Sequence, residues 1–368
     1  MLGQAIRLAG GTAAMVSGGW VMHALHGVPK SLGASPMQIH RVAKDSPNYR
    51  DGVFHNTEPS VMLSIDRAQM WKVAHDMFGG TGQRPAGEIP VVVPDICSPA
   101  ADLAATWMGH SSVLIEVDGY RVLADPVWSQ RCSPSQVVGP ARLHPTPLPL
   151  SSLPAIDAVI ISHDHYDHLD TETIVELGRG QNALFYVPLG IGQHLRRWGI
   201  PDARITELDW GERARLAELE LVCTPARHFS GRSLSRDHTL WSSWAVLGPR
   251  HRVFFGGDTG YTKAFADVGD ELGPFDLTLM PVGAYHPSWP DIHMNPEEAV
   301  RAHRDVSDSG LLVPIHWATF RLAPHAWSEP VERMLSAAAE TGVATATPRP
   351  GQRVAQLGDA ADAWWREL

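Results

Sequence analysis

Residues 160–169 read Ile-Ile-Ser-His-Asp-His-Tyr-Asp-His-Leu, and three histidines and two aspartates fall within six consecutive positions. The run 156–161 that leads into them is apolar apart from Asp157, and a short apolar run rich in β-branched residues is typical of a buried strand. His163 and His165 alternate along extended chain and therefore point the same way. Imidazoles and carboxylates at this spacing suit zinc or a similar divalent ion. The stretch therefore predicts a metal site at the carboxyl end of a strand, and the alternative is a polar loop that happens to be rich in histidine.

The pattern His-x-His-x-Asp-His after an apolar strand resembles the signature of the metallo-β-lactamase superfamily. Further motifs, in the same order along the chain, resemble one branch of it, the N-acyl-phosphatidylethanolamine-hydrolysing phospholipases D. The resemblance covers roughly residues 45 to 350. Its motifs are Trp107-Met108-Gly109-His110, Ala124-Asp125-Pro126, Ser133-Pro134-Ser135-Gln136, Gly256-Gly257-Asp258-Thr259-Gly260-Tyr261, Gly273-Pro274-Phe275-Asp276 and Ile315-His316-Trp317.

The resemblance implies an α+β fold, a four-layer αββα sandwich of metallo-β-lactamase type with an N-terminal extension. It also implies two zinc ions per chain. Three candidate ligands outside the first cluster, His228, Asp258 and His316, each follow the end of a predicted strand, so the scaffold can bring them together. Each of them taken alone could equally be a surface or capping residue. By the resemblance, His163, His165 and His228 hold one ion, Asp167, His168 and His316 hold the second, and Asp258 bridges both.

The activity that the resemblance implies is hydrolysis of N-acyl-phosphatidylethanolamine to N-acylethanolamine and phosphatidic acid, by a hydroxide that both ions hold. Asp167, Asp258 and His293 are the candidate catalytic residues, and Tyr166 and His293 are expected to contact the lipid phosphate. His293 lies two residues before Asn295, which is the expected N-cap of a helix whose positive end favours anions. The alternative for these two contacts is a packed tyrosine and an exposed loop histidine.

Several neighbouring residues have expected supporting roles. Metal-bound imidazoles usually donate their second N–H to a carboxylate or carbonyl, and Asp125 and His110 are the candidate partners. For Asp125 the alternative is ordinary turn chemistry before a proline. Asp164 is interpreted as a loop carboxylate rather than a ligand. Gly231 stands where the mammalian lipase has a basic residue near a bile-acid site, which argues against bile-acid regulation here.

Composition limits the other classes of function. A chain of 368 residues with 44% hydrophobic and 19% charged residues can build a sizeable core, and its formal net charge of −10 argues against a nucleic-acid partner. The three cysteines show no paired spacing, so no disulfide framework is expected.

Two alternatives to the lipid hydrolase remain. One is a hydrolase of the same fold acting on a soluble phosphorylated substrate, as sugar-phosphate lactonases do, and the other is a metal-binding or membrane-surface protein without activity. The presence of all seven candidate ligands disfavours the second. The aromatic stretches 285–290 and Trp364–Trp365 favour a lipid, although aromatic residues are more often part of a core. A phospholipid substrate with peripheral membrane contact is therefore expected, and a homodimer is left open.

The chain divides into four expected parts: an N-terminal extension 1–45, an elaboration 46–100 packed on the core, a catalytic domain 101–350 and a C-terminal tail 351–368. Residues 1–30 are moderately apolar and rich in small residues, so a signal, a membrane anchor, a surface-lying segment and a poorly ordered extension all fit. The side of the membrane, cytoplasmic or periplasmic, is left undecided.

The predicted elements follow from local patterns. Asp118-Gly119 between two apolar runs predicts a hairpin with a type I′ turn, and six prolines within residues 133–154 predict a long stiff loop. Strands are predicted at 218–224, 239–247 and 252–255, and helices at 64–78, 170–178, 190–199, after Asn295 and at 328–342.

Overall fold

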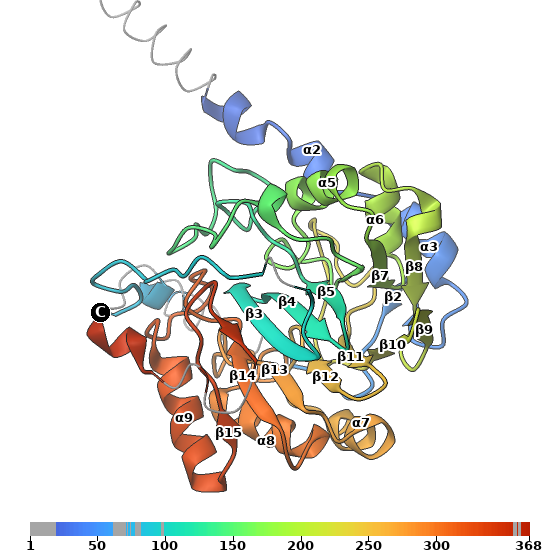
Figure 1. Ribbon diagram of the computed structural model, residues 1–368. Helices are drawn as coiled ribbons and strands as arrows, with labels where there is room; N and C mark the ends of the chain where they lie inside the picture. The colour runs from blue at the N-terminus through green and yellow to red at the C-terminus, as the bar shows by residue number, and fades with distance from the viewer. Residues whose placement is uncertain are drawn as a thin grey trace, which may run out of the picture.

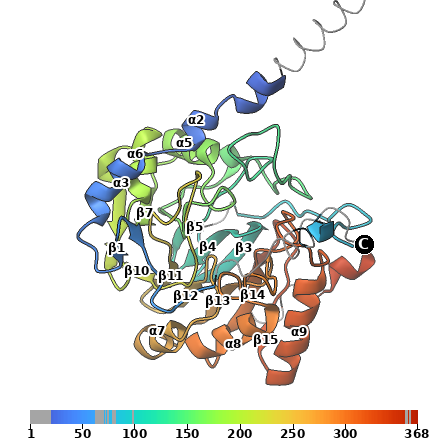
Figure 2. The ribbon, with the colours of Figure 1, turned by 180° about the vertical axis from the view of Figure 1, so that it is seen from behind.

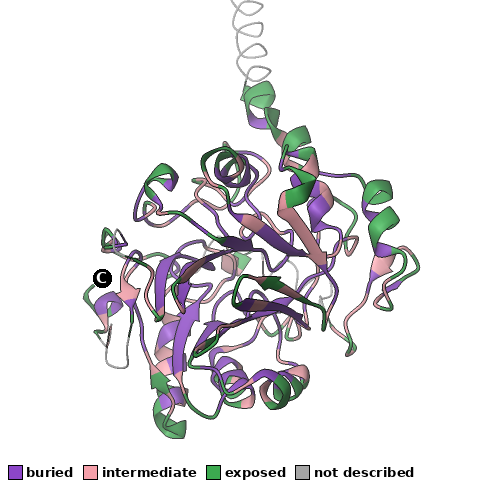
Figure 3. Ribbon diagram, turned by 45° about the vertical axis from the view of Figure 1, so that its right-hand side comes forward, coloured by how far each residue is buried: buried purple, intermediate pink, exposed green. Residues whose placement is uncertain are grey.

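The structure is a computed structural model, and it describes residues 20–61, 71, 73, 75–77, 82–96, 99–355, 359 and 362–368. Two seven-stranded mixed sheets face each other, and helices cover the outer face of each sheet (Figures 1 and 3). This is the expected αββα arrangement. Most of the predicted helix 64–78, and residues 1–19 of the N-terminal extension, lie outside the described residues.

The first sheet has the order β16-β3-β4-β5-β6-β7-β8. It is antiparallel from β16 to β5 and parallel from β5 to β8, and α5 and α6 cover its outer face (Figure 1). Its elements are β3 (Leu103–Gly109), β4 (Ser112–Val117), β5 (Tyr120–Ala124), β6 (Ala158–Ile160), α5 (Thr171–Gly180), β7 (Leu184–Pro188), α6 (Ile191–Arg197), β8 (Ile205–Leu208) and β16 (Arg353–Val354).

The second sheet has the order β15-β14-β13-β12-β11-β10-β9. It is antiparallel from β9 to β12 and parallel from β12 to β15, and helices α7 to α9 lie along its outer face. Its elements are β9 (Arg213–Leu216), β10 (Leu219–Thr224), β11 (Ser243–Leu247), β12 (Arg252–Phe255), α7 (Ala264–Leu272), β13 (Leu277–Pro281), α8 (Pro296–Val306), β14 (Leu311–Ile315), α9 (Glu329–Thr341) and β15 (Ala344–Thr345).

Side chains alternate between two cores because successive residues of a strand point to opposite faces. On β4, Val113 and Ile115 belong to the large core between the sheets, whereas Leu114 packs in the separate core beneath α5 and α6. Trp107 and Trp317 stack at the edge of the large core with ring centroids 5.7 Å apart. Each sheet therefore has both faces covered by apolar side chains.

Several predictions from local sequence are confirmed. Asp118 and Gly119 have φ angles of 46° and 88°, as a type I′ turn between β4 and β5 requires. Asn295 caps α8, because its side chain accepts from the backbone N–H of Glu298 while Glu298 accepts from the N–H of Asn295.

Other predictions need correction. The strand expected from residue 239 begins only at Ser243, and the proline-rich loop contains a short 3-10 helix at Leu150–Ser152. The stretch expected as a C-terminal tail contributes β16 to the first sheet and buries Trp364 and Trp365 beside Trp317. These aromatic residues therefore belong to the core rather than to a lipid-facing surface.

The N-terminal residues run along the side of the body next to α6 (Figure 2). They form α2 (Val28–Ser31), α3 (Pro36–Ala43) and a small hairpin of β1 (Tyr49–Arg50) and β2 (Val53–Phe54) that local patterns did not predict. No described helix combines the length and the hydropathy that crossing a membrane requires.

Residues 30–34 form a segment that we call the N-terminal strap. Gly33 suits it because φ is +71° and a Cβ there would lie 2.1 Å from His194 Nδ1. Four polar contacts tie the strap to the body: Trp198 Nε1 to Lys30 O at 2.8 Å, Lys30 Nζ to Glu172 at 2.8 Å, Arg232 Nε to Ser31 O at 2.8 Å and Ala34 N to His194 Nδ1 at 2.8 Å.

Candidate metal centre

The seven predicted ligands come from loops at one end of the two sheets. The cluster 163–168 follows β6 of the first sheet, and His228, Asp258 and His316 follow β10, β12 and β14 of the second. These strand ends lie at the same edge of the sandwich, so ligands that are distant in sequence converge between the sheets. The structure thus brings all seven residues together.

The first set consists of His163, His165 and His228. His165 Nδ1 lies 2.8 Å from His163 Nε2 and 3.4 Å from His228 Nε2. Burial lowers the pKa of all three imidazoles, and for His163 and His228 it does so well below the ordinary value. Neutral imidazoles that direct ring nitrogens at one point form a donor set for a divalent cation.

The second set consists of Asp167, His168 and His316. Asp167 Oδ2 lies 3.5 Å from Nε2 of each of the two histidines. Burial by itself would lower the pKa of His316, but the neighbouring Asp258 and Asp167 raise it to about 9. This set therefore attracts positive charge, which protons supply when no cation is bound.

Asp258 lies between the two sets. Its Oδ2 atom is 3.1 Å from Nε2 of His168 and of His316. The same oxygen is 3.9 Å from His163 Nε2 and 3.8 Å from His228 Nε2. A single carboxylate within reach of both sets is the geometry that a bridging ligand needs.

Three of the candidate donor atoms are buried without a hydrogen-bond partner in the described part of the chain, as expected of atoms that bind a cation. His168 Nε2, His316 Nε2 and Asp258 Oδ1 are buried and lack a hydrogen-bond partner among the described residues. Burying polar atoms without partners costs free energy, and an ion held by them would remove that cost. The second set with Asp258 therefore fits a divalent ion, and the converging ring nitrogens of the first set are a further group of candidate ligands.

Hydrogen bonds from the second ring nitrogen of two ligand histidines hold these imidazoles in place. The carboxylate of Asp125 is fully buried and accepts from His168 Nδ1 at 2.6 Å and from the backbone N–H of Ser162 at 2.7 Å. His228 Nδ1 donates to Ile292 O at 2.7 Å. The expected role of Asp125 as a partner of a ligand histidine is confirmed by this contact, and it orients the imidazole of His168.

His110 lies close enough to the second set to be a candidate metal ligand itself, rather than only a hydrogen-bond partner of a ligand. Its Nε2 atom donates to Asp167 Oδ2 at 2.9 Å, and it shares one cluster of candidate ligand atoms with Asp167, His168 and His316. Burial lowers the pKa of His110 to about 3, so its imidazole is neutral. The indole of Trp107 donates to His110 O at 2.7 Å and fixes the turn that carries it.

The two predicted substrate contacts are placed differently. His293 Nδ1 lies 3.9 Å from Asp258 Oδ2 and has no hydrogen-bond partner among the described residues. Burial lowers the pKa of His293 to about 4, so it is neutral at physiological pH. The hydroxyl of Tyr166 donates to Arg232 O at 2.7 Å, and the Arg232 guanidinium lies 4.1 Å from the centroid of its ring. The phenol is thus engaged with the protein, and its role toward substrate stays a prediction.

Sequence reasoning missed the support beneath the metal loop. Arg232 is buried, and its Nη1 donates to Asp164 O and Leu169 O at 2.7 Å each. Asp164 is not a free loop carboxylate, because its Oδ1 accepts from Gly231 N at 2.7 Å and His194 Nε2 lies 3.4 Å from its Oδ2. A guanidinium that closes a loop through carbonyl oxygens leaves no local pattern in the sequence.

A model of the β-lactamase superfamily domain matches residues 120–317, which is more than half of the chain. An uncharacterised protein of Mycobacterium tuberculosis is 58% identical over the full length of both chains. The Caenorhabditis elegans protein named N-acyl-phosphatidylethanolamine-hydrolyzing phospholipase D 1 is 40% identical over 70% of this chain and 76% of its own.

Among solved structures, a metallo hydrolase from the archaeon Ignicoccus hospitalis covers 68% of this chain and 97% of its own, with a TM-score of 0.52 and 23% identity. This likeness shows the fold alone. Together with the sequence matches, it shows that the chain belongs to the β-lactamase superfamily of metal-dependent hydrolases, in which it is related to the N-acyl-phosphatidylethanolamine-hydrolysing phospholipases D.

Proposed function

We propose that the chain is a dinuclear zinc phosphodiesterase of phospholipase D type, which hydrolyses N-acyl-phosphatidylethanolamine to N-acylethanolamine and phosphatidic acid. The observation that carries this proposal is the position of Asp258 Oδ2, 3.1 Å from the nearest nitrogens of the second set and 3.8–3.9 Å from those of the first. The relative from Caenorhabditis elegans supports the choice of substrate.

The donor set of imidazoles and carboxylates suits zinc. His163, His165 and His228 would hold one ion, Asp167, His168 and His316 the other, and Asp258 both. Bound there, the ions supply an activated water and neutralise charge on the phosphate.

His293 has the geometry to act on the phosphate directly. It is neutral and its Nδ1 has no partner among the described residues, so it can donate one hydrogen bond to a phosphate oxygen. It precedes the N-cap of α8, where the helix dipole favours negative charge. A donor that is already in place stabilises charge as it develops without reorganisation.

The space next to His293 also fits the proposal. Tyr285, Pro287, Pro290 and His325 help to line a pocket that borders this histidine. Glu298, Glu329 and Arg333 also line it, so its wall is mixed, and a mixed wall suits a group that has both polar and apolar parts. We therefore place the N-acylethanolamine portion of the lipid in this pocket.

Peripheral membrane contact is part of the same proposal. Trp20, Met22 and Leu25 near the start of the described chain are 55%, 73% and 55% exposed. Large apolar side chains exposed together are costly in water and favour the interface of a bilayer. A homodimer remains a prediction.

The test is product analysis by mass spectrometry on a panel of phospholipids, N-acylated and not, with metal analysis of the same preparation. We expect about two zinc ions per chain and release of N-acylethanolamine with phosphatidic acid, and neither product from Asp258→Asn. Cleavage of soluble sugar phosphates, with none of the lipids turned over, would instead support the lactonase-like alternative.

A further inference from the structure

Residues 54–61 lie across three loops of the metal centre, and we call them the Asn56 segment. The loops follow β10, β12 and β13, and they carry His228, Asp258 and His293. The segment bonds to each loop: Arg227 Nε to Ser60 Oγ at 3.1 Å, the Thr262 hydroxyl to Glu58 Oε1 at 2.7 Å and Val61 N to Asp291 Oδ2 at 2.7 Å. It lies outside residues 120–317, the part of the chain that matches the superfamily domain.

Asn56 holds the main chain of one ligand residue on both sides. Its Nδ2 atom donates to His228 O at 2.8 Å, and its Oδ1 atom accepts from the N–H of His228 at 3.0 Å. The indole N–H of Trp241, which can only donate, also points at Oδ1 at 2.9 Å. The reverse orientation of the amide would place its NH₂ group against two donors, and therefore Oδ1 must face them. The backbone of His228 is thus fixed by a side chain more than a hundred residues away in sequence.

The position of His228 matters because its imidazole belongs to the first set of ligands. The ring is fully buried, and its Nδ1 donates to Ile292 O at 2.7 Å. Its Nε2 lies 3.4 Å from His165 Nδ1 and 3.8 Å from Asp258 Oδ2. Zinc takes an imidazole nitrogen at about 2.0–2.1 Å, with a tolerance of about 0.2 Å. A ligand held through both its main chain and its second ring nitrogen is directed before the ion binds, so less conformational entropy is lost on binding.

We propose that Asn56 is a positioning residue of the metal centre, which keeps Nε2 of His228 directed at the first ion by holding the main chain behind it. The inference rests on the two-ion centre of the proposed function and not on its substrate. Loss of an outer partner of a ligand weakens metal binding about ten- to a hundredfold, and Asn56 acts through the backbone, so we expect the lower value.

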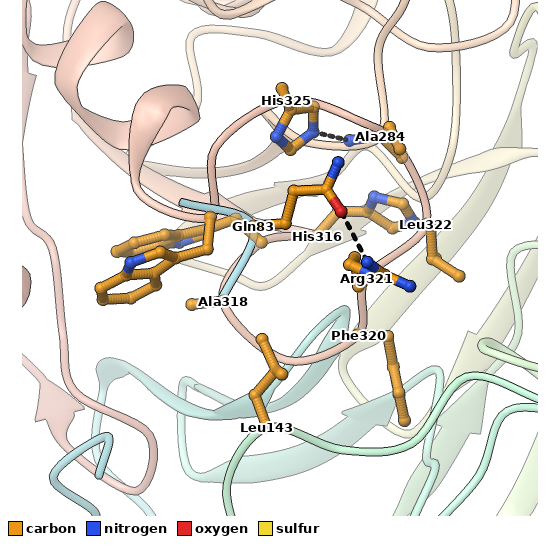
Figure 4. Close-up of a pocket in the computed structure, with 12 residues that line it drawn as sticks. Gln83, Leu143, Ala284, His316, Ala318, Phe320, Arg321, Leu322 and His325 are labelled. Carbon is orange, nitrogen blue, oxygen red and sulfur yellow. Dashed lines mark hydrogen bonds between the residues drawn. The ribbon is translucent and has the colours of Figure 1, made fainter. Parts of the chain in front are cut away.

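Gln83 is a matched control from the same N-terminal part of the chain. Its amide also takes part in three hydrogen bonds, in which it donates to Asp76 O and Pro324 O and accepts from Arg321 Nη1. Figure 4 shows the last of these contacts beside the loop that carries His316. Gln83 therefore supports a loop of the second sheet, as Asn56 does, but none of these three hydrogen bonds reaches a metal ligand.

The experiment is a titration of zinc-loaded protein with a competing chelator, in which metal content is followed through the release of both ions. Asp125→Asn identifies the release step of the second ion, because it removes the partner of His168 Nδ1. Asn56→Ala should weaken zinc binding in the other step about tenfold and leave the step marked by Asp125→Asn unchanged. With cobalt(II) in place of zinc, the visible spectrum of the ion in the first position should change in the same variant, since it depends on the arrangement of the ligands.

Asn56→Asp keeps an oxygen for both donors and loses only the donor to His228 O. It should therefore fold and bind the first ion with an affinity between those of the wild type and Asn56→Ala. Gln83→Ala should lower the thermal stability without moving the release of the first ion. Unchanged affinity for the first ion in both Asn56 variants, or an equal shift in Gln83→Ala, overturns the inference. Because the titration requires no turnover, failure to cleave N-acyl-phosphatidylethanolamine would count against the proposed function and leave this result intact.

Discussion

Replacing Asp125 with asparagine should weaken one of the two metal positions without removing a ligand. The carboxylate accepts three hydrogen bonds, from His168 Nδ1 at 2.6 Å, from the Ser162 N–H at 2.7 Å and from the Ser162 hydroxyl at 2.5 Å. Asparagine keeps the shape and tolerates the left-handed backbone there, where φ is 39°. However, its NH₂ group must face a donor in either orientation.

The magnitude follows from the bond that is lost. A hydrogen bond to a charged group contributes about 1.5–3 kcal/mol, which corresponds to about ten- to a hundredfold in affinity. Loss of an outer partner of a metal-bound imidazole has an effect of the same size. We therefore expect zinc at the position of His168 to bind about ten- to a hundredfold more weakly, while the other ion is retained.

The assay is metal content after dialysis against graded concentrations of a competing chelator. Asp118→Asn is a closely matched control, because the side chain of Asp118 is only 3% exposed, its φ is 46° and it accepts from His251 Nδ1 at 2.8 Å at a distant turn. If Asp125→Asn retained both ions as tightly as the wild type, or if Asp118→Asn lost metal equally, the assignment of Asp125 as an orienting partner would be wrong.

Four further predictions concern the ligands and their neighbours. Asp258 and Asp167 raise the pKa of His316 to about 9, so a proton competes with the metal for this imidazole below that pH. Metal affinity at this position should therefore fall about tenfold per pH unit. Dialysis at decreasing pH should release one ion before the other, and simultaneous release would contradict this prediction. Asp258→Asn should abolish turnover because no single carboxylate would then reach both sets, so full activity with both metals bound would exclude the bridging role. His293→Ala should lower kcat about ten- to a hundredfold with metal content unchanged. Tyr166→Phe should have a smaller effect, since the hydroxyl already donates to a backbone carbonyl, and metal analysis of both variants separates substrate contacts from ligands.

Local sequence patterns predict a structural feature correctly where residues close in sequence determine that feature. The hairpin at Asp118-Gly119 and the cap at Asn295 depend on contacts within a few residues, and both were predicted correctly. The convergence of the ligands was also predictable, but only because the resemblance supplied positions such as His316. Its own surroundings give no sign of a partner more than a hundred residues away.

The support beneath the site could not be read from local sequence, because it is made of long-range contacts to backbone oxygens. Arg232 holds the metal loop through carbonyl groups, which every residue possesses. Trp364 and Trp365 are buried, and they follow β16, which pairs with β3 of the first sheet. No hydrophobic periodicity in the last residues predicts that pairing. Packing of this kind is decided by tertiary structure, so of the two interpretations of these aromatic residues the structure confirms the core and not the lipid-facing surface.

The N-terminal strap contacts the metal loop through Arg232, so we expect metal binding to affect residues of the strap. The Ala34 amide donates to His194, 160 residues away in sequence, and Arg232 joins Ser31 to the carbonyl groups of the metal loop. We predict that these bonds link docking of the strap to ordering of the loop, in which case each stabilises the other by the same free energy. Where zinc binds only the docked form, a hundredfold excess over Kd contributes about 2.7 kcal/mol, so hydrogen exchange at Ala34 should slow about a hundredfold on metal addition. By the same reciprocity, a chain shortened to begin after the strap would bind zinc more weakly although every ligand is present.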